Sequence, residues 1–354
     1  MRFELPADPS TVRRARFARW LSVAFAVLLI GLVAYFGYVG YEGSRQLAGH
    51  PSPSTDCRTP GSIGLTYEAI NYDTGTDAAL AAEPDPEACV GKAGAAGEAI
   101  VTSDGIRIAG WYVPAAADIG PAGATVVLAH GWGANKSQML DYIALLSERY
   151  NVVAFDQRNH GQSSGDQTTQ GVLEQLDLRA VIDWLVATKA PQQIALFGVS
   201  MGGATAINEA VGDERVAAVV MDSTHARLGH AAQARLELAG YPLSLPGSWA
   251  VLLGGLLRTG QDMSAVDPVH AIARNAERPV LVIEAGQDAA IGPADGQELL
   301  EAAEAAGGDA ELEICEPAGH AKAIEECPAE YREWVLGFLD RAFGAAAQAR
   351  VQTH

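Results

Sequence analysis

The sequence from residue 124 to residue 315 alternates short runs rich in β-branched residues with longer stretches that have helical periodicity. Each intervening stretch is long enough for a crossover helix, so the pattern predicts an α/β fold with a mostly parallel central sheet and helices on both faces. A terminal helix over residues 328–343 should pack against this sheet. The runs that we expect to form core strands are 125–129, 152–155, 194–197, 216–221, 279–284 and 310–315.

Two further β-structures are expected before these runs. Residues 65–72 read as a strand, and residues 100–113 read as a hairpin with its turn at residues 103–105. Residues 73–97 are rich in turn-forming residues and should form an insertion on the surface.

The domain that follows from this pattern covers residues 55–345, with a tail over residues 346–354. Residues 223–268 lack a strand-like run and contain Gly-Tyr-Pro and Pro-Gly-Ser turns. A long segment of this kind inside an α/β domain is typical of a small helical cap over a pocket, where substrate choice would be set.

Residues 21–41 are an uninterrupted run of 21 uncharged, mostly apolar residues. At roughly 1.5 Å per residue, a helix of this length spans about the 30 Å thickness of the hydrocarbon core of a membrane. We therefore expect one transmembrane helix here. Residues 42–54 are rich in Pro, Gly and Ser and read as a linker.

The charges around this run predict its orientation. Four arginines lie within residues 13–19, whereas only Glu42 and Arg45 follow the run closely. The positive-inside rule then places residues 1–20 in the cytoplasm and the domain that follows the run outside it. The alternative is a cleaved signal peptide, but the run exceeds the apolar region of about 7 to 15 residues of such peptides and no small-x-small cleavage site follows at once.

The net charge of −19 makes the protein strongly acidic. Such a charge repels phosphate backbones, so nucleic acid is not an expected partner.

The four cysteines, Cys57, Cys89, Cys315 and Cys327, all follow the predicted span and would meet an oxidising environment. Three full pairings are possible, and four free thiols are an alternative. Proximity in the sequence favours Cys57 with Cys89 and Cys315 with Cys327. No C-x-x-C pair occurs, so no metal site is expected.

Residues 198–202 read Gly-Val-Ser-Met-Gly, between a strand-like run and a helix-like stretch. This is the context of a nucleophile elbow, in which the glycines allow a strained turn that lifts the serine hydroxyl off the end of a sheet. We predict that Ser200 is a catalytic nucleophile.

A serine nucleophile needs a histidine base, and the histidine needs a carboxylate to orient it. His320 follows the last predicted strand, and Asp288 follows the strand before it. Ser200, Asp288 and His320 then occur in the chain order of the α/β-hydrolase scaffold. Asp222, at the end of an earlier strand, is the alternative acid.

An oxyanion hole requires two backbone donors near the nucleophile. Residues 130–133 read His-Gly-Trp-Gly directly after an early core strand, and the glycines would let the backbone approach the substrate. We assign the backbone N–H groups of Trp132 and Met201 to this hole.

Taken together, these motifs resemble those of the α/β-hydrolases, in particular membrane-anchored or secreted bacterial serine hydrolases with a small cap. The resemblance implies hydrolysis of an ester, thioester or amide through an acyl-enzyme, without a cofactor, and a small acyl ester or lipid-like substrate. It extends over residues 65–343 and is carried by residues 130–133, 156–163, 198–202, Asp288 and His320.

Other function classes remain as alternatives. A non-catalytic binding or sensing protein can share this scaffold, and an acyltransferase or haloperoxidase-like enzyme can share the triad. Hydrolysis of halides or epoxides would instead require an aspartate at the position of Ser200.

Overall fold

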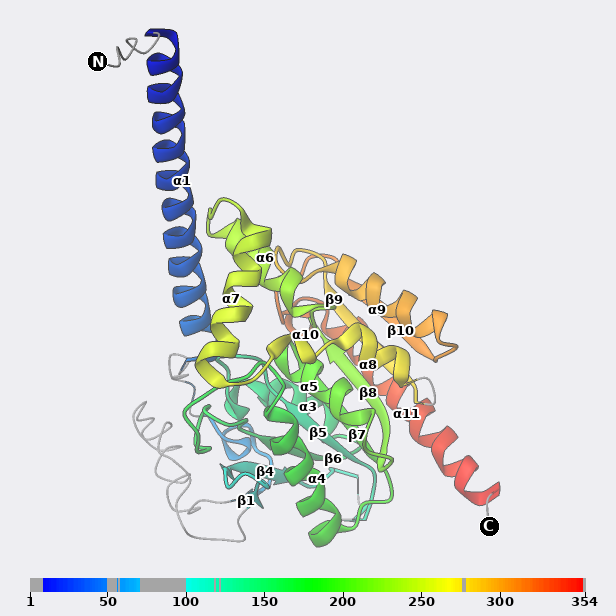
Figure 1. Ribbon diagram of the computed structural model, residues 1–354. Helices are drawn as coiled ribbons and strands as arrows, with labels where there is room; N and C mark the ends of the chain where they lie inside the picture. The colour runs from blue at the N-terminus through cyan, green and yellow to red at the C-terminus, as the bar shows by residue number, and fades with distance from the viewer. Residues whose placement is uncertain are drawn as a thin grey trace, which may run out of the picture.

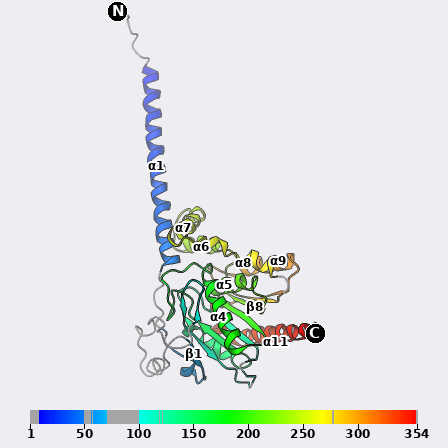
Figure 2. The ribbon, with the colours of Figure 1, turned by 60° about the horizontal axis from the view of Figure 1, so that its bottom comes forward.

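The computed structural model describes residues 9–49, 56, 58–70, 100–117, 119–120, 122–275 and 278–352. A central sheet lies between two layers of helices, and a long N-terminal helix, α1 (Pro9–Ala48), projects from the domain (Figure 1). The second view shows the same projection (Figure 2). The predicted insertion at 73–97 and the predicted Cys57–Cys89 pair lie outside the described residues.

The main sheet has eight strands in the described part of the chain, in the order β1-β4-β6-β5-β7-β8-β9-β10. The strands from β5 to β10 pair in parallel with their neighbours, whereas β4 pairs antiparallel with both β1 and β6. This confirms the predicted mostly parallel sheet. The strand bounds are β1 Glu68–Ile70, β4 Gly110–Val113, β5 Thr125–Ala129, β6 Asn151–Phe155, β7 Ile194–Val199, β8 Val216–Asp222, β9 Val280–Ala285 and β10 Ala310–Cys315.

The hairpin expected over residues 100–113 is shorter than predicted. Strands β2 (Ile100–Val101) and β3 (Arg107–Ile108) pair with each other in a small separate sheet. The chain then enters the main sheet as β4, because the buried residues of β4 pair with β6.

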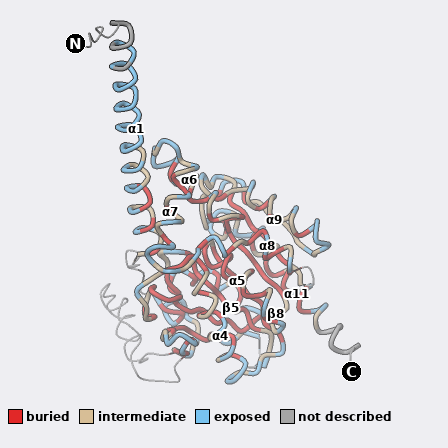
Figure 3. The backbone as a smooth tube through the Cα atoms, viewed as in Figure 1, coloured by how far each residue is buried: buried red, intermediate tan, exposed pale blue. Residues whose placement is uncertain are grey.

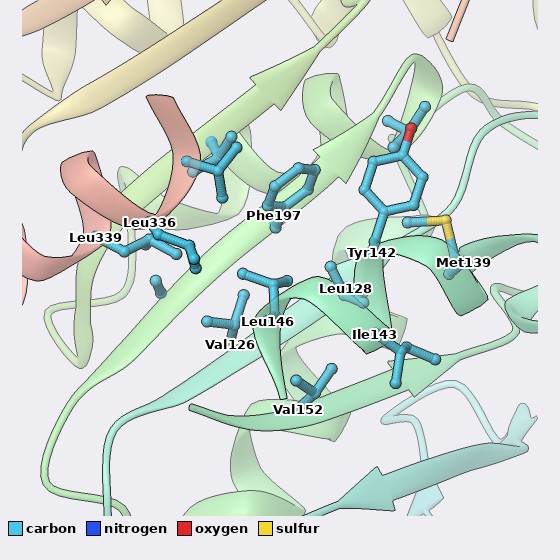
Figure 4. Close-up of a cluster of buried hydrophobic side chains, with 14 of the residues drawn as sticks. Val126, Leu128, Met139, Tyr142, Ile143, Leu146, Val152, Phe197, Leu336 and Leu339 are labelled. Atoms are coloured by element: carbon cyan, nitrogen blue, oxygen red, sulfur yellow. The ribbon is translucent and has the colours of Figure 1, made fainter. Parts of the chain in front are cut away.

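The core lies on both faces of the main sheet. On one face, Val126 and Leu128 of β5 pack with residues of α3 (Leu140–Leu146) and α11 (Pro328–Gln352), and the labelled side chains in Figure 4 belong to this cluster. On the other face, Val127 and Ala129 pack beneath α4 (Glu174–Lys189), α5 (Met201–Ala210), α8 (Pro268–Arg274) and α9 (Pro293–Ala305). Strands covered on both faces read as continuous apolar runs, which explains why the sequence showed them clearly.

The helix α11 is longer than predicted. It begins at Pro328, as expected, but continues to Gln352 through most of the segment assigned to a tail.

The cap predicted over residues 223–268 lies between β8 and β9. It consists of α6 (Leu228–Leu238), α7 (Ser244–Thr259) and the short 3-10 helix η4 (Met263–Ala265). The Gly-Tyr-Pro sequence forms the turn between α6 and α7, where Gly240 has a φ of +75°.

Helix α1 contains one apolar stretch, Arg16–Ala48, that is long enough to cross a membrane, although a signal sequence would pass the same criterion. The helix does not end at Tyr41, and residues 42–48 are not the linker that we predicted. They remain helical because Ser44 and Ala48 are buried where α1 packs beside α7. Figure 3 shows the change from an exposed upper part of α1 to a partly buried lower part.

The predicted pairing of Cys315 with Cys327 is confirmed. A disulfide joins them, with their Cα atoms 6.1 Å apart. It ties the end of β10 to the start of α11 and encloses the loop that carries His320.

Candidate active site

Ser200 lies at the sharp turn between β7 and α5, in the backbone conformation of φ 54° and ψ −117°. Both flanking positions require glycine, because neighbouring backbone atoms leave no room for a Cβ atom there. A Cβ atom on Gly198 would lie 2.1 Å from the carbonyl oxygen of Gly202, and one on Gly202 would lie 2.1 Å from that of Ala129. The turn is therefore the strained elbow that the sequence predicted.

The structure brings Ser200, His320 and Asp288 together from three separate strand ends. The Nε2 atom of His320 lies 3.1 Å from the hydroxyl oxygen of Ser200. On the other side of the ring, Nδ1 lies 2.5 Å from Oδ2 of Asp288. This is the hydrogen-bonding order that nucleophile, base and orienting acid require.

Asp288 is held in place by its own loop. Its second oxygen, Oδ1, accepts hydrogen bonds from the backbone N–H groups of Ala290 at 2.9 Å and Ile291 at 3.0 Å. Burial opposes the charge, but the hydrogen bonds from His320 and these two amides outweigh it and hold the pKa of Asp288 below its usual value. The carboxylate is therefore charged at neutral pH.

Asp222, the alternative acid, is fully buried and bonded elsewhere. Its Oδ2 accepts hydrogen bonds from Tyr331 at 2.6 Å and Tyr142 at 3.3 Å, and its Oδ1 accepts one from Ser223 at 2.8 Å. Burial raises the pKa of Asp222 against the opposing effect of these hydroxyl donors. These contacts fit a structural group better than a partner of His320.

This network also supports the His320 loop. The hydroxyl of Ser223 accepts a hydrogen bond from the backbone N–H of Ala321 at 3.0 Å, and the backbone N–H of Ser200 donates to the carbonyl of Asp222 at 2.8 Å. No local sequence pattern predicts this role, because Ser223 and Ala321 are 98 positions apart.

The two residues assigned to the oxyanion hole, Trp132 and Met201, line the same cavity as Ser200. Met201 is the first residue of α5, so its N–H has no acceptor within the helix. A Cβ atom on Gly131 would lie only 3.3 Å from the Cβ of Ser200, so a glycine brings the loop that carries Trp132 against the nucleophile.

The loop of residues 156–163 is built around buried polar groups. Asp156 accepts hydrogen bonds from the backbone N–H groups of Lys136 and Gln162, each at 2.8 Å. His160 accepts one from the N–H of Gly133 at 3.1 Å and so connects this loop to the one that carries Trp132.

His130 fixes the same region. Its Nε2 accepts a hydrogen bond from the backbone N–H of Gln157 at 3.0 Å. Burial lowers the pKa of His130 to about 3, so the ring is neutral and can keep this acceptor.

A cavity of about 420 Å³ opens beside Ser200, and its walls come from both the cap and α1. One cap-side residue had no predicted role. His225 is buried and lines the cavity, and its Nε2 has no hydrogen-bond partner among the described residues. Burial lowers the pKa of His225 to about 4, so this ring is neutral.

Within the described residues, no three His, Cys, Asp or Glu side chains are grouped so as to hold a metal ion.

Comparison with known proteins decides the family. The model of the alpha/beta hydrolase family matches residues 126–334, which is more than half of the chain. The chain belongs to this family. The alpha/beta-hydrolase fold predicted from the motifs is thereby confirmed.

Two relatives of this alpha/beta hydrolase illustrate its kinship among bacterial proteins. It is 36% identical over 149 residues to the uncharacterized protein YfhR of Escherichia coli K12, which corresponds to 40% of this chain and 51% of YfhR. It is 31% identical over 224 residues to the uncharacterized protein YqkD of Bacillus subtilis, or 61% of this chain and 71% of YqkD.

Among solved structures, this alpha/beta hydrolase is similar to the esterase Pf2001 of Pyrococcus furiosus. The TM-score is 0.63 at 22% sequence identity, with 83% of this chain and 98% of the esterase covered. At this identity the similarity establishes the fold, and the esterase activity belongs to that protein.

Proposed function

We propose that the protein is a serine hydrolase that cleaves carboxylic esters through an acyl-enzyme. Membership of the alpha/beta hydrolase family supports hydrolase activity in general. The proposal of a serine nucleophile rests on the continuous hydrogen-bonded chain from the hydroxyl of Ser200 through His320 to Asp288.

In the first half-reaction, the oxygen of Ser200 attacks the ester carbonyl while Nε2 of His320 takes the hydroxyl proton. Asp288 keeps the proton of the neutral ring on Nδ1 and stabilises the imidazolium that forms. The imidazolium then protonates the leaving alkoxide, and the alcohol departs. Water attacks the acyl-enzyme by the same proton route and releases the acid.

The negative charge that develops on the carbonyl oxygen needs donors that are already in place. We assign this role to the backbone N–H groups of Trp132, in the loop after β5, and of Met201, the first residue of α5. Loss of one such donor typically costs about 2.7 to 4 kcal/mol of transition-state stabilisation.

The walls of the cavity support an acyl substrate. Leu228 and Leu236 of α6 and Val251 of α7 line it together with Ser200. Apolar walls of this kind suit the acyl part of an ester or a thioester, whereas the reacting carbonyl lies at the polar end beside the triad. Helix α1 would hold the enzyme on the membrane, with residues 1–20 in the cytoplasm and the domain outside.

The proposal is tested with the full chain purified in detergent beside Ser200→Ala. The wild type should react with a fluorophosphonate probe and turn over p-nitrophenyl esters, and both activities should vanish in the variant. A folded wild type that neither labels nor turns over any ester would contradict the proposal and favour a non-catalytic binding protein.

A further inference from the structure

The outer face of α7 is apolar and exposed. Leu245, Trp249, Leu253 and Leu257 follow one another at intervals of four residues, so they form one stripe along the helix. Trp249 is 63% exposed and Leu257 is 79% exposed. The segment from Ser244 to Leu257 contains no charged residue. A continuous apolar stripe of this kind marks a surface that contacts an apolar partner.

Helix α1 packs directly against the other side of α7. A Cβ atom on Gly40 would lie 2.6 Å from the carbonyl oxygen of Ala250, and one on Gly254 would lie 2.4 Å from that of Gly40. Backbones in such close contact at small residues are typical of helix pairs in membranes. Figures 1 and 2 both show α7 beside the lower part of α1. The outer face of α7 therefore lies beside the apolar helix α1 and points away from the contact between the two helices.

The contacts between the two helices also indicate how deep in the membrane the cap would lie. The hydroxyl of Tyr35 donates a hydrogen bond to the carbonyl of Pro242, in the loop between α6 and α7. Tyr35 precedes Tyr41, the end of the predicted span, by six residues, which is about 9 Å along a helix. Surface-bound helices bury their apolar face about 5–10 Å into a membrane. The exposed side chain of Leu243 in this loop would thus lie in the bilayer.

The cavity at Ser200 runs along α1 towards the predicted membrane span. Val39, Gly43 and Leu47 of α1 line it. From Leu47 to Val39 the helix rises by about 12 Å, so the cavity extends along α1 to within the predicted span. Two polar residues that line it, Glu42 and Gln46, lie just beyond the end of that span, at the expected level of lipid headgroups.

We propose that α1 is a wall of the substrate pocket as well as an anchor, and that the outer face of α7 lies in the adjoining leaflet of the membrane. The pocket then takes the acyl chain of an amphiphilic ester directly from the bilayer, and Ser200 attacks its carbonyl to release the alcohol part. The choice of substrate rests on the proposed hydrolase function, whereas the docking of α7 does not.

The docking is tested by fluorescence of the full chain in phosphatidylcholine vesicles that contain lipids with a nitroxide on the acyl chain. These lipids quench tryptophans that lie within the membrane. We compare Trp249→Phe with Trp184→Phe, which changes a tryptophan on α4, far from α7. The fluorescence intensity lost to quenching should fall in Trp249→Phe and stay unchanged in Trp184→Phe. Equal quenching in wild type and Trp249→Phe would overturn the docking.

The entry of substrate is tested by turnover of a long-chain ester embedded in the vesicles and of soluble p-nitrophenyl acetate. Leu253→Asp and Leu257→Asp should lower the ratio of the two rates by about tenfold or more, because a charge on this face opposes its burial in lipid. Val186→Asp changes an exposed apolar residue of α4 and is the matched control, for which the ratio should not change.

The outcomes separate this inference from the proposed function. If Trp249 is quenched but the ratio is unchanged in both aspartate variants, substrate enters from water and the inferred route is wrong. If the wild type turns over neither ester, the hydrolase function fails, while the quenching still decides whether α7 docks on the membrane.

Discussion

Replacement of Asp288 by asparagine should lower kcat by about four orders of magnitude while the protein stays folded. Oδ1 of Asp288 accepts hydrogen bonds from two backbone N–H groups, and Oδ2 accepts one from His320. An asparagine keeps only one acceptor oxygen. The two backbone donors will hold this oxygen, so the amide NH₂ will face Nδ1 of His320.

The reversed contact changes the tautomer of the base. Nδ1 must then accept a hydrogen bond from the amide, so the ring carries its own proton on Nε2. A protonated Nε2 cannot accept the proton of Ser200, although the side chains remain within contact distance. A 10⁴-fold loss corresponds to about 5.5 kcal/mol of transition-state stabilisation.

The assay is steady-state turnover of a p-nitrophenyl ester, with thermal unfolding as the check on folding. The matched control is Asp222→Asn, which makes the same chemical change at the alternative acid. There the two tyrosine hydroxyls lose a carboxylate acceptor, so we expect a loss of stability of about 1–3 kcal/mol with kcat lowered by far less than in Asp288→Asn. Near-wild-type turnover of Asp288→Asn, with the large loss in Asp222→Asn, would refute this reasoning.

Three further outcomes are expected. Gly202→Ala should abolish fluorophosphonate labelling, because its Cβ would lie 2.1 Å from the carbonyl oxygen of Ala129; labelling at the wild-type rate would contradict the assigned elbow. Replacing both Cys315 and Cys327 by serine should lower the free energy of unfolding by about 3 kcal/mol in urea titrations, since the disulfide closes a short loop; an unchanged midpoint would argue against that contribution. Burial lowers the folded-state pKa of His130 to about 3, so the unfolded state binds a proton first and the free energy of unfolding should fall as the pH drops from about 6.5 towards 3. Urea titrations at several pH values should show that this free energy changes less steeply with pH in His130→Gln. The same pH dependence in both proteins would exclude His130 as a cause of the acid destabilisation.

The sheet could be predicted because each strand is marked by a run of apolar residues within a few positions of the sequence. Strands such as β5, β7 and β9 are buried on both faces, so their apolar runs stand out in the sequence. The candidate triad followed from the same pattern, because the ends of parallel strands meet at one edge of a sheet. Ser200, Asp288 and His320 each follow such a strand.

The features that the sequence did not reveal depend on tertiary contacts. Residues 42–48 adjoin a stretch rich in Pro and Ser, so the composition of residues 42–54 as a whole predicts a linker. Residues 42–48 are helical because they pack against a cap helix more than 200 positions later. The partners of Asp222 come from α3, from α11 and from the residue after β8, and no local pattern joins them. The buried position of His225 depends in the same way on how the cap is placed over the sheet.

The position of α1 in the wall of the cavity links the location of this protein to its chemistry. If α1 anchors the domain as proposed, a protease that cut the chain after residue 49 would release the domain from the membrane and would also remove Val39, Gly43 and Leu47 from the cavity. The shed domain would keep Ser200, Asp288 and His320 but would bind acyl groups in a cavity with one side open. Cleavage would therefore change the substrate selectivity of the enzyme as well as its location. The detached and anchored forms would then differ in the substrates that they prefer.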